Sequence, residues 1–217
     1  GDSFVYTETA PIGDGLLQFG AFGDNGDPPV VRFTGNRPNG WEYGAMVALG
    51  ENVKFMDIHF QLHSGQDEPG GIGGSDLLLL RVTNEHGGCL LGDDIFVVGS
   101  VLNNPSGNPS YAFGERIAVF NTEFGPSHSH SVYGECQPKA IFAGNTFQDV
   151  ENVGRTGVRL AANTCSSHNI LVTGNRFENI TLQAIQIQVT TTNDERFRER
   201  DIVIEKNRFS QCGGVFI

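Results

Sequence analysis

The chain has 217 residues, among them 29 glycines and nine prolines, and a formal net charge of −11 at pH 7. This acidic balance argues against nucleic acid as a partner, because nucleic-acid binding requires basic patches. No run of 18 apolar residues is present, so we expect no membrane span. The glycine and proline content is typical of a single domain with many bends rather than of a helical protein.

A pattern of apolar residues, a turn and a phenylalanine recurs along the chain. Its copies are VKFMDIHF, IFVVGSVL, IAVFNTEF, AIFAGNTF, ILVTGNRF and IVIEKNRF, which end at Phe60, Leu102, Phe124, Phe147, Phe177 and Phe209. The steps between these positions are 42, 22, 23, 30 and 32 residues, so the unit is about 22 residues with insertions. A period of this size indicates a stacked repeat architecture.

The residues within each copy predict a strand with one buried face. Apolar residues such as Ile170 and Val172 alternate with polar ones, and no segment carries a helical stripe. Short strands that return at this period pair with their equivalents one turn on, which predicts a parallel β-helix. Asn145, Asn175 and Asn207 fall at one point of three successive turns, so we predict that they form a single buried ladder.

With these features the chain resembles the right-handed parallel β-helix proteins of the pectin-lyase-like superfamily over most of residues 52–217. The resemblance implies that ILVTG is the second strand of a coil, RFENI the short third strand and AIQIQV the first strand of the next coil, which faces the binding groove in that family. We expect one domain over 1–217, with first coils in 1–50 and regular coils in 51–217. The chain opens and stops within the pattern, so we expect a piece of a longer chain that contacts further coils or chains end to end.

Residues 1–50 resemble the opening of many secreted β-helix proteins, with a Gly-Asp-x-Phe sequence, an apolar strand, a Gly-Ala-aromatic-Gly bend and a Pro-Val strand. Asp14, Asp24 and Asp27 lie there among glycines. Carboxylates in such a loop can ligate calcium, although Asp-Asn-Gly-Asp is also ordinary turn chemistry. We expect no cofactor, and calcium is the alternative.

Residues 61–94 form the largest interruption of the repeat, in which a Gly/Pro-rich loop at 65–74 leads into an expected apolar strand at 77–82 and a short second piece through Leu91. Loops of this length inside a compact fold are often functional, and the resemblance implies that they form groove walls. Their histidines and acids match no metal-binding spacing, so we expect no metal site there.

The stretch with most chemical content is 124–137. Aligning SVYGE with the later strands GVRLA and AIQIQ predicts an outward column of Tyr133, Arg159 and Gln186, over inward Val132, Val158 and Ile185. Glu135 and Gln188 would lie one step along the strands, and Arg81 would extend the column on its earlier side. His128 and His130 alternate just before the column, so both rings are expected on one face.

Such a column suits acidic-sugar chemistry. Elimination across C4 and C5 of a uronic acid requires a cation for the carboxylate, a base for the C5 proton and an acid for the leaving oxygen. Arg159 would neutralise the carboxylate, His130 or His128 would be the base and Tyr133 the acid. The resemblance implies this reaction class. Tyrosine beside arginine is also a common stacking pair and histidine often bonds a bend, so non-catalytic binding and a purely structural role stay open.

The segment TTTNDERFRERD at 190–201 carries Arg196, Arg198 and Arg200. Their alternation with other residues predicts an extended arm whose arginines meet a polyanionic sugar, or else a solvated loop that balances local acids. We include Arg198 with Arg81, Glu135, Gln186 and Gln188 among the expected substrate-binding residues.

Cys136 and Cys165 follow equivalent strands of adjacent turns, so we expect a disulfide between them, which fits an oxidising compartment. Taken together, the sequence predicts an all-β, right-handed parallel β-helix that is secreted or displayed at a cell surface. We expect it to act on an extracellular, acidic polysaccharide as a lyase, or as an epimerase that shares the first proton abstraction. The alternative is a non-catalytic polysaccharide-binding or structural segment of a surface fibre, adhesin or phage spike.

Overall fold

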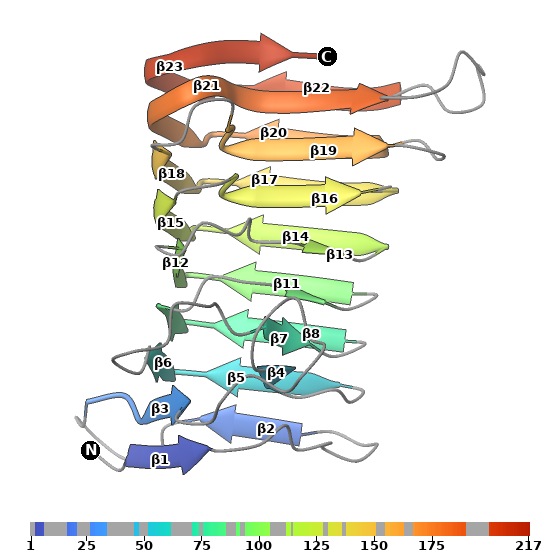
Figure 1. Ribbon diagram of the computed structural model, residues 1–217. Helices are drawn as coiled ribbons and strands as arrows, with labels where there is room; N and C mark the ends of the chain where they lie inside the picture. Colours follow the sequence, from blue (N-terminus) through green and yellow to red (C-terminus); the bar gives the residue numbers. More distant parts are fainter. Residues whose placement is uncertain are drawn as a thin grey trace, which may run out of the picture.

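The chain forms a solenoid of parallel strands in the computed structural model (Figure 1). The structure describes residues 3–6, 17–20, 27–33, 46–47, 52–61, 71–73, 76–85, 90–91, 94–104, 112–113, 115–127, 130–135, 138–150, 155–162, 167–189 and 200–217. Within these ranges the regular structure is all strand, and no helix is long and apolar enough to cross a membrane.

Three sheets stack the strands, and every pairing between strands is parallel. The eight-stranded sheet contains β2 (Leu17–Gly20), β5 (Val53–Met56), β8 (Asp76–Leu80), β11 (Asp94–Val98), β14 (Arg116–Phe120), β17 (Lys139–Ala143), β20 (His168–Thr173) and β22 (Arg200–Glu205). The four-stranded sheet contains β4 (Met46–Val47), β7 (Gly71–Gly73), β10 (Leu90–Leu91) and β13 (Ala112–Phe113).

The eleven-stranded sheet spans two sides of the coil. One side is built from β1 (Ser3–Tyr6), β3 (Val30–Phe33), β6 (His59–Gln61), β9 (Thr83–Asn84), β12 (Val101–Asn104), β15 (Glu123–Ser127), β18 (Thr146–Val150), β21 (Arg176–Val189) and β23 (Arg208–Phe216). The other side is built from β16 (Val132–Glu135), β19 (Val158–Ala162) and the second halves of β21 and β23. In Figure 1 the chain rises from the N-terminus at the bottom to the C-terminus at the top. β16 and β19 run to the right on the near side, and the strands of the eight-stranded sheet run to the left behind them, so the solenoid is right-handed, as predicted.

The strand assignment within a coil is confirmed. ILVT lies in β20 and Gly174 in the bend after it, and the third strand and the first strand of the next coil are merged in the 14-residue β21. The two runs merge because Asn179, in the left-handed region at φ 52°, turns the corner without breaking the ladder.

The phenylalanine column is confirmed. Leu102, Phe124, Phe147, Phe177 and Phe209 lie in register, and the rings of Phe124, Phe147 and Phe177 stack with centroids 4.7 and 4.8 Å apart. This spacing equals the distance between neighbouring strands, so each ring lies flat on the next.

One step of the predicted repeat is wrong. The interval of 42 residues between Phe60 and Leu102 contains a further coil, with β8 and β9, so 61–94 is not simply an interruption. In this coil Asn84 pairs with both Phe60 and Leu102 and is buried in the column. A polar residue at an aromatic position hid the coil from the alignment.

The asparagine ladder is confirmed. The side-chain oxygen of Asn175 accepts hydrogen bonds from the backbone N–H (2.9 Å) and the amide (3.0 Å) of Asn145, and Asn207 does the same for Asn175 (2.9 Å each). Asn145 and Asn175 are buried, and Asn207 at the end of the stack is half-buried. Thr122 and Ser100 continue the ladder with hydroxyls in place of amides.

The bend before each ladder residue has a fixed conformation. The preceding residue adopts positive φ in every coil from Gly99 onward: Gly99, Asn121, Gly144, Gly174 and Lys206. Glycine and asparagine tolerate this conformation best, which explains the Gly-Asn pairs in the sequence. The bend and the ladder together close each coil around a core of buried aliphatic and aromatic side chains.

Candidate functional site

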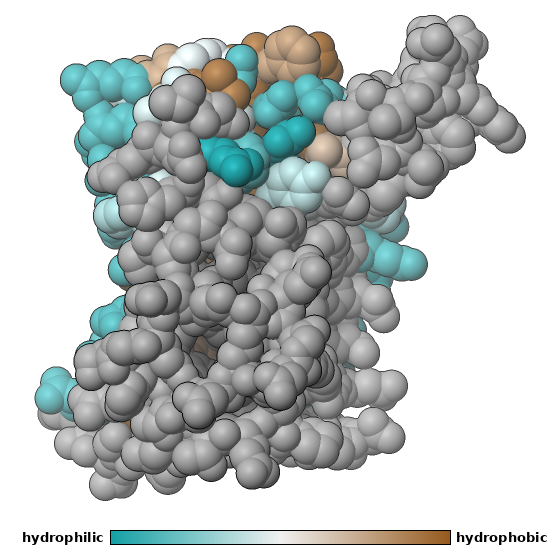
Figure 2. Space-filling view, viewed as in Figure 1, coloured by the Kyte–Doolittle hydropathy of each residue, from teal (hydrophilic) through white to brown (hydrophobic). Residues whose placement is uncertain are grey.

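The predicted outward column exists at the C-terminal half of the solenoid. Tyr133 of β16 pairs with Arg159 of β19, and Arg159 pairs with Gln186 of β21. All three side chains are half-buried, whereas Val132, Val158 and Ile185 beside them are buried, as the alternation requires. In Figure 2 hydrophilic side chains gather on this face over β19 and β21.

The outward positions two residues further along the same strands are only partly polar. Glu135 pairs along the backbone with Ala161, and Ala161 pairs with Gln188. Ala161 faces outward by alternation yet is only 1% exposed, so neighbouring groups cover the face at this point. The Gln186 amide donates a hydrogen bond to the Gln188 side-chain oxygen (2.8 Å), which holds two amides together on β21.

The prediction that Arg81 extends the column is wrong. Arg81 follows β8 at the opposite corner of the coil, where it adopts positive φ and its N–H donates to the carbonyl of Val98. Its guanidinium forms a bidentate pair with Asp57 of the preceding coil, with N–O distances of 2.6 and 2.7 Å. The insertion before β8 shifted the alignment by part of a coil, which explains the error.

His130 lies two residues before β16 and is only 1% exposed. Its ring lies beside the outward side chains of Tyr133 and Arg159 and not with the inward Val132, because the bend at Ser131 resets the alternation. Its Nδ1 lies 3.0 Å from the backbone N of Thr156 and 2.8 Å from the Thr156 hydroxyl. Its Nε2 lies 3.4 Å from Nη1 of Arg155 and 3.3 Å from Nη1 of Arg159. The ring is therefore held on one side by the next coil and faces two cations on the other.

The partners of the ring define its tautomer. A backbone N–H can only donate, so Nδ1 must accept from Thr156, and the proton of the neutral ring lies on Nε2. This N–H points toward two guanidinium groups that also can only donate. Three sets of donors thus converge on one region of space.

The electrostatic environment agrees with a neutral ring. Burial, followed by the positive charges of Arg159 and Arg155, lowers the pKa of His130 to about 3. A positive charge on the ring would be the third in the cluster and would be repelled by both guanidinium groups.

The converging donors lack acceptors among the described residues. Nε of Arg159 and the hydroxyl of Ser131 are buried without a hydrogen-bond partner there, and no described carboxylate pairs with Arg155 or Arg159. By contrast, Arg81, Arg116 and Arg176 each pair with an acid. In a chain of net charge −11, two such cations side by side are a local exception.

Tyr133 forms one wall of this region. Its ring lies 5.4 Å from the guanidinium carbon of Arg159 and 5.6 Å from the centre of the His130 ring. We call Arg155, Arg159, His130 and Tyr133 the arginine cluster. It combines a planar aromatic surface with converging donors, which can hold a planar anionic group such as a carboxylate.

Sequence reasoning missed Arg155 and Thr156. The alignment that found the column places His130 beside Thr156 and Ser129 beside Arg155, one coil apart. Extending that alignment two residues toward the N-terminus would have found both residues.

Several predicted residues lie outside the described residues. They are His128, Arg198, Cys136 and Cys165, with Asp14 and Asp24 of the expected calcium loop. Of Glu135 only the backbone is described. Where side chains are described, no group of three or more His, Cys, Asp or Glu is arranged to hold a metal ion.

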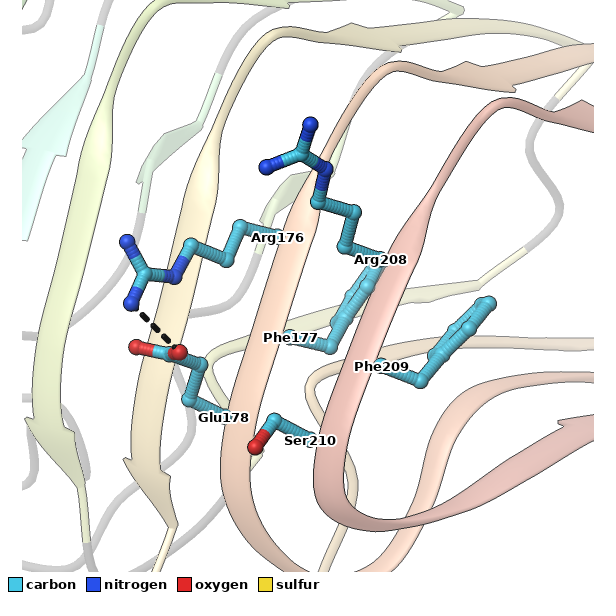
Figure 3. A pocket seen from close by; sticks show the side chains of 6 residues that line it. All are labelled: Arg176, Phe177, Glu178, Arg208, Phe209 and Ser210. Carbon is cyan, nitrogen blue, oxygen red and sulfur yellow. Dashed lines mark ion pairs between the residues drawn. The ribbon is translucent and has the colours of Figure 1, made fainter.

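An open pocket of about 560 Å³ lies on another side of the molecule, on the last coils (Figure 3). Phe177 and Phe209 stack beneath it with centroids 5.4 Å apart, and Arg176 pairs with Glu178 at 2.6 Å. Arg176 is neutralised by Glu178 and Arg208 is exposed, so this pocket offers an anion one exposed cation, whereas the arginine cluster offers two half-buried ones.

Comparison of the chain with protein-family models, curated proteins and solved structures gave no match.

Proposed function

We propose that the protein binds an acidic polysaccharide without cleaving it, through the face formed by β16, β19 and β21. The observation that carries this proposal is the convergence of donors in the arginine cluster. The guanidinium groups of Arg155 and Arg159 both lie against Nε2 of His130, and Nε of Arg159 is buried with no hydrogen-bond partner among the described residues.

A sugar carboxylate supplies what the cluster lacks. Its two oxygens offer about four lone-pair sites in one plane, which match the planar fork of an arginine. Hydrogen bonds between charged groups are worth about 1.5–3 kcal/mol each, more than those between neutral groups.

The rest of the face fits the neutral part of a sugar ring. Tyr133 presents an aromatic ring beside the cation, and Gln186 and Gln188 present side-chain amides one coil on. Successive coils lie about 4.8 Å apart, close to the length of one sugar unit, so a chain running along the solenoid axis would meet one polar position per unit.

Binding is favoured over elimination by the state of His130. Nδ1 accepts from Thr156 and Nε2 carries the proton, so the ring has no lone pair with which to remove the C5 proton. A pKa of about 3 also makes it a weak base at neutral pH.

Titration calorimetry with oligomers of uronic acids and with neutral oligosaccharides of the same length tests the proposal. We expect binding of the acidic oligomers only, with an affinity that falls as salt increases. Arg159→Gln should weaken binding about 10- to 100-fold. Arg81→Gln, which removes an arginine already paired with Asp57, is the control and should bind like the parent.

The same mixtures should be followed for the ultraviolet absorbance of the unsaturated elimination product. Its appearance with the parent protein, and its loss in Tyr133→Phe, would replace the binding proposal by a lyase. Equal binding by the Arg159→Gln and Arg81→Gln variants would place the site elsewhere.

A further inference from the structure

The outer face of the eight-stranded sheet is apolar at positions where alternation predicts polar residues. One column of paired outward residues runs along the solenoid through Leu78, Phe96, Ala118, Ile141, Leu171 and Val203. Its exposed members are Phe96 (45%), Ile141 (37%) and Val203 (49%). Six successive coils thus present apolar side chains on both faces of this sheet, although only one face is needed for the core.

Two further columns flank the first. Two residues along the strands, Leu80, Val98, Phe120 and Ala143 form a second apolar column, and all four are half-buried. A charged column lies on the other side of the first, two residues back along the strands. It consists of Asp76, Asp94, Arg116 and Lys139. We call these three columns the outer face.

We propose that the outer face binds a second copy of the chain. The two-fold axis runs along the strand direction, between β11 and β14. It lies at the middle of the sheet, with β2, β5, β8 and β11 on one side and β14, β17, β20 and β22 on the other. The copies then meet face to face with their coils in opposite order, and all eight strands are covered.

Side-chain size matches under this symmetry. Rotation about the axis preserves the position along the strand, so each column meets its own equivalent. Phe96 then lies opposite Ala118 of the second copy, which is only 9% exposed between its larger neighbours. Leu80 likewise lies opposite Ala143. In these two pairs a large residue meets a small one, while Leu78 meets Ile141 and Val98 meets Phe120 as apolar pairs, so every described match in the two apolar columns of these four strands is apolar.

Charge matches in the same arrangement. The charged column is acidic on one side of the axis and basic on the other, so Asp94 meets Arg116 of the second copy and Asp76 meets Lys139. Arg116 already pairs with Asp94 of its own chain and its side chain is 59% exposed, so it can bridge two carboxylates. The reverse pairing, acid against acid, would be repulsive.

The area is sufficient for association. Eight strands at about 4.8 Å spacing and five residues at about 3.3 Å give a face of about 600 Å² per copy. The two copies together bury about 1,200 Å², where the range of stable interfaces begins. Lys54 is the one charged residue within the central column among β5 to β22, and its stem can cover Leu171 of the second copy.

Sedimentation of the whole chain over a range of concentrations tests the proposal. The parent should sediment as a dimer, and Phe96→Glu as a monomer, because a charge would be placed against an apolar face. Phe209→Glu is the matched control: Phe209 is 43% exposed but lies beside Phe177 on β23, outside both the outer face and the proposed sugar-binding face, so this variant should stay dimeric. Circular dichroism and unchanged sugar binding show that each variant is folded, and Ile141→Glu repeats the test at a second position.

Cross-linking tests the direction of the coils. In an Asp76→Cys/Lys139→Cys variant the two new thiols lie three strands apart within one chain, about 14 Å, too far for a disulfide. They meet only across the proposed axis, so a short thiol-specific linker should give covalent dimers in the double variant and not in either single one or in the parent. A monomeric parent, a dimer that survives Phe96→Glu, or covalent dimers absent from the double variant would each overturn the proposal.

Discussion

The asparagine ladder and the arginine cluster both place polar side chains in the buried part of the solenoid, with opposite results. In the ladder Asn175 satisfies every polar atom it approaches: it accepts from Asn145 and donates to the carbonyl of Phe142 and to Asn207. In the cluster His130 and two arginines present donors to one another, and the Nε of Arg159 has no described partner.

This difference separates a structural polar group from a functional one. A buried polar group without a partner costs about 1–3 kcal/mol, so a folded chain keeps one chiefly where a ligand supplies the missing atom. Residue type alone does not distinguish the two sites, because both follow the same repeat. They are distinguished by whether each buried donor and acceptor has a hydrogen-bond partner.

At neutral pH the largest effect is expected from breaking the ladder. Asn175→Ala removes the acceptor of the Asn145 backbone N–H and the donor to the carbonyl of Phe142, so the free energy of unfolding should fall by about 3 kcal/mol. Gln148→Ala, which removes an exposed hydrogen bond to Glu123, should change it by less than about 0.5 kcal/mol. Chemical denaturation measures both, and equal effects would show that the ladder does not stabilise the fold.

The next largest loss of stability is expected from a substitution at Gly157. This residue follows Thr156, which holds His130, and lies against the core. A Cβ there would lie 2.8 Å from the carbonyl oxygen of Ala184 and 3.1 Å from the Phe177 ring. Gly157→Ala should therefore destabilise the chain by about 1–3 kcal/mol and displace Thr156, which holds His130. Gly214→Ala is the control, since nothing lies within 4 Å of its added Cβ. A neutral Gly157→Ala substitution would mean that this coil has room to adjust.

The third effect depends on pH. The pKa of His130 is about 3 in the folded chain and about 6.5 when unfolded, so only the unfolded chain takes up this proton between those values. Stability therefore falls as pH decreases from 6.5 toward 3, by up to about 1.4 kcal/mol per pH unit from this group. In His130→Asn this contribution is absent, so the variant should lose less stability between pH 7 and pH 4. Parallel curves for the two proteins would contradict a neutral buried ring.

The smallest effect is expected from the cations of the cluster. Arg155→Gln should change the free energy of unfolding by less than about 0.5 kcal/mol, because no described acid loses a partner. The same substitution should weaken the binding of uronic-acid oligomers. A loss of stability comparable with that of Asn175→Ala would make Arg155 a structural residue.

The sequence predicted the parts of the fold that repeat. Phe147, Phe177 and the three asparagines recur at one position of the coil, so their stacking followed from the period alone. The coil that contains Asn84 was missed because its column residue is polar, and Arg81 was misplaced because an insertion shifted the register.

The site was predicted less completely than the fold. The Tyr133–Arg159–Gln186 column followed from register, but the tautomer of His130 depends on a backbone N–H of the next coil, which residue type does not encode. The outer face was not anticipated either, because alternation was used to find the core and not to ask what covers the other side of the strand.

The most direct test of the account is the pKa of His130, measured by nuclear magnetic resonance with and without an oligomer of uronic acids. Without ligand the ring should stay neutral down to about pH 3, with its proton on Nε2. With ligand, a carboxylate between Arg155 and Arg159 should offset their charges and accept from Nε2, so the pKa should rise. An unchanged pKa under conditions where the oligomer binds would show that the arginine cluster is not its site.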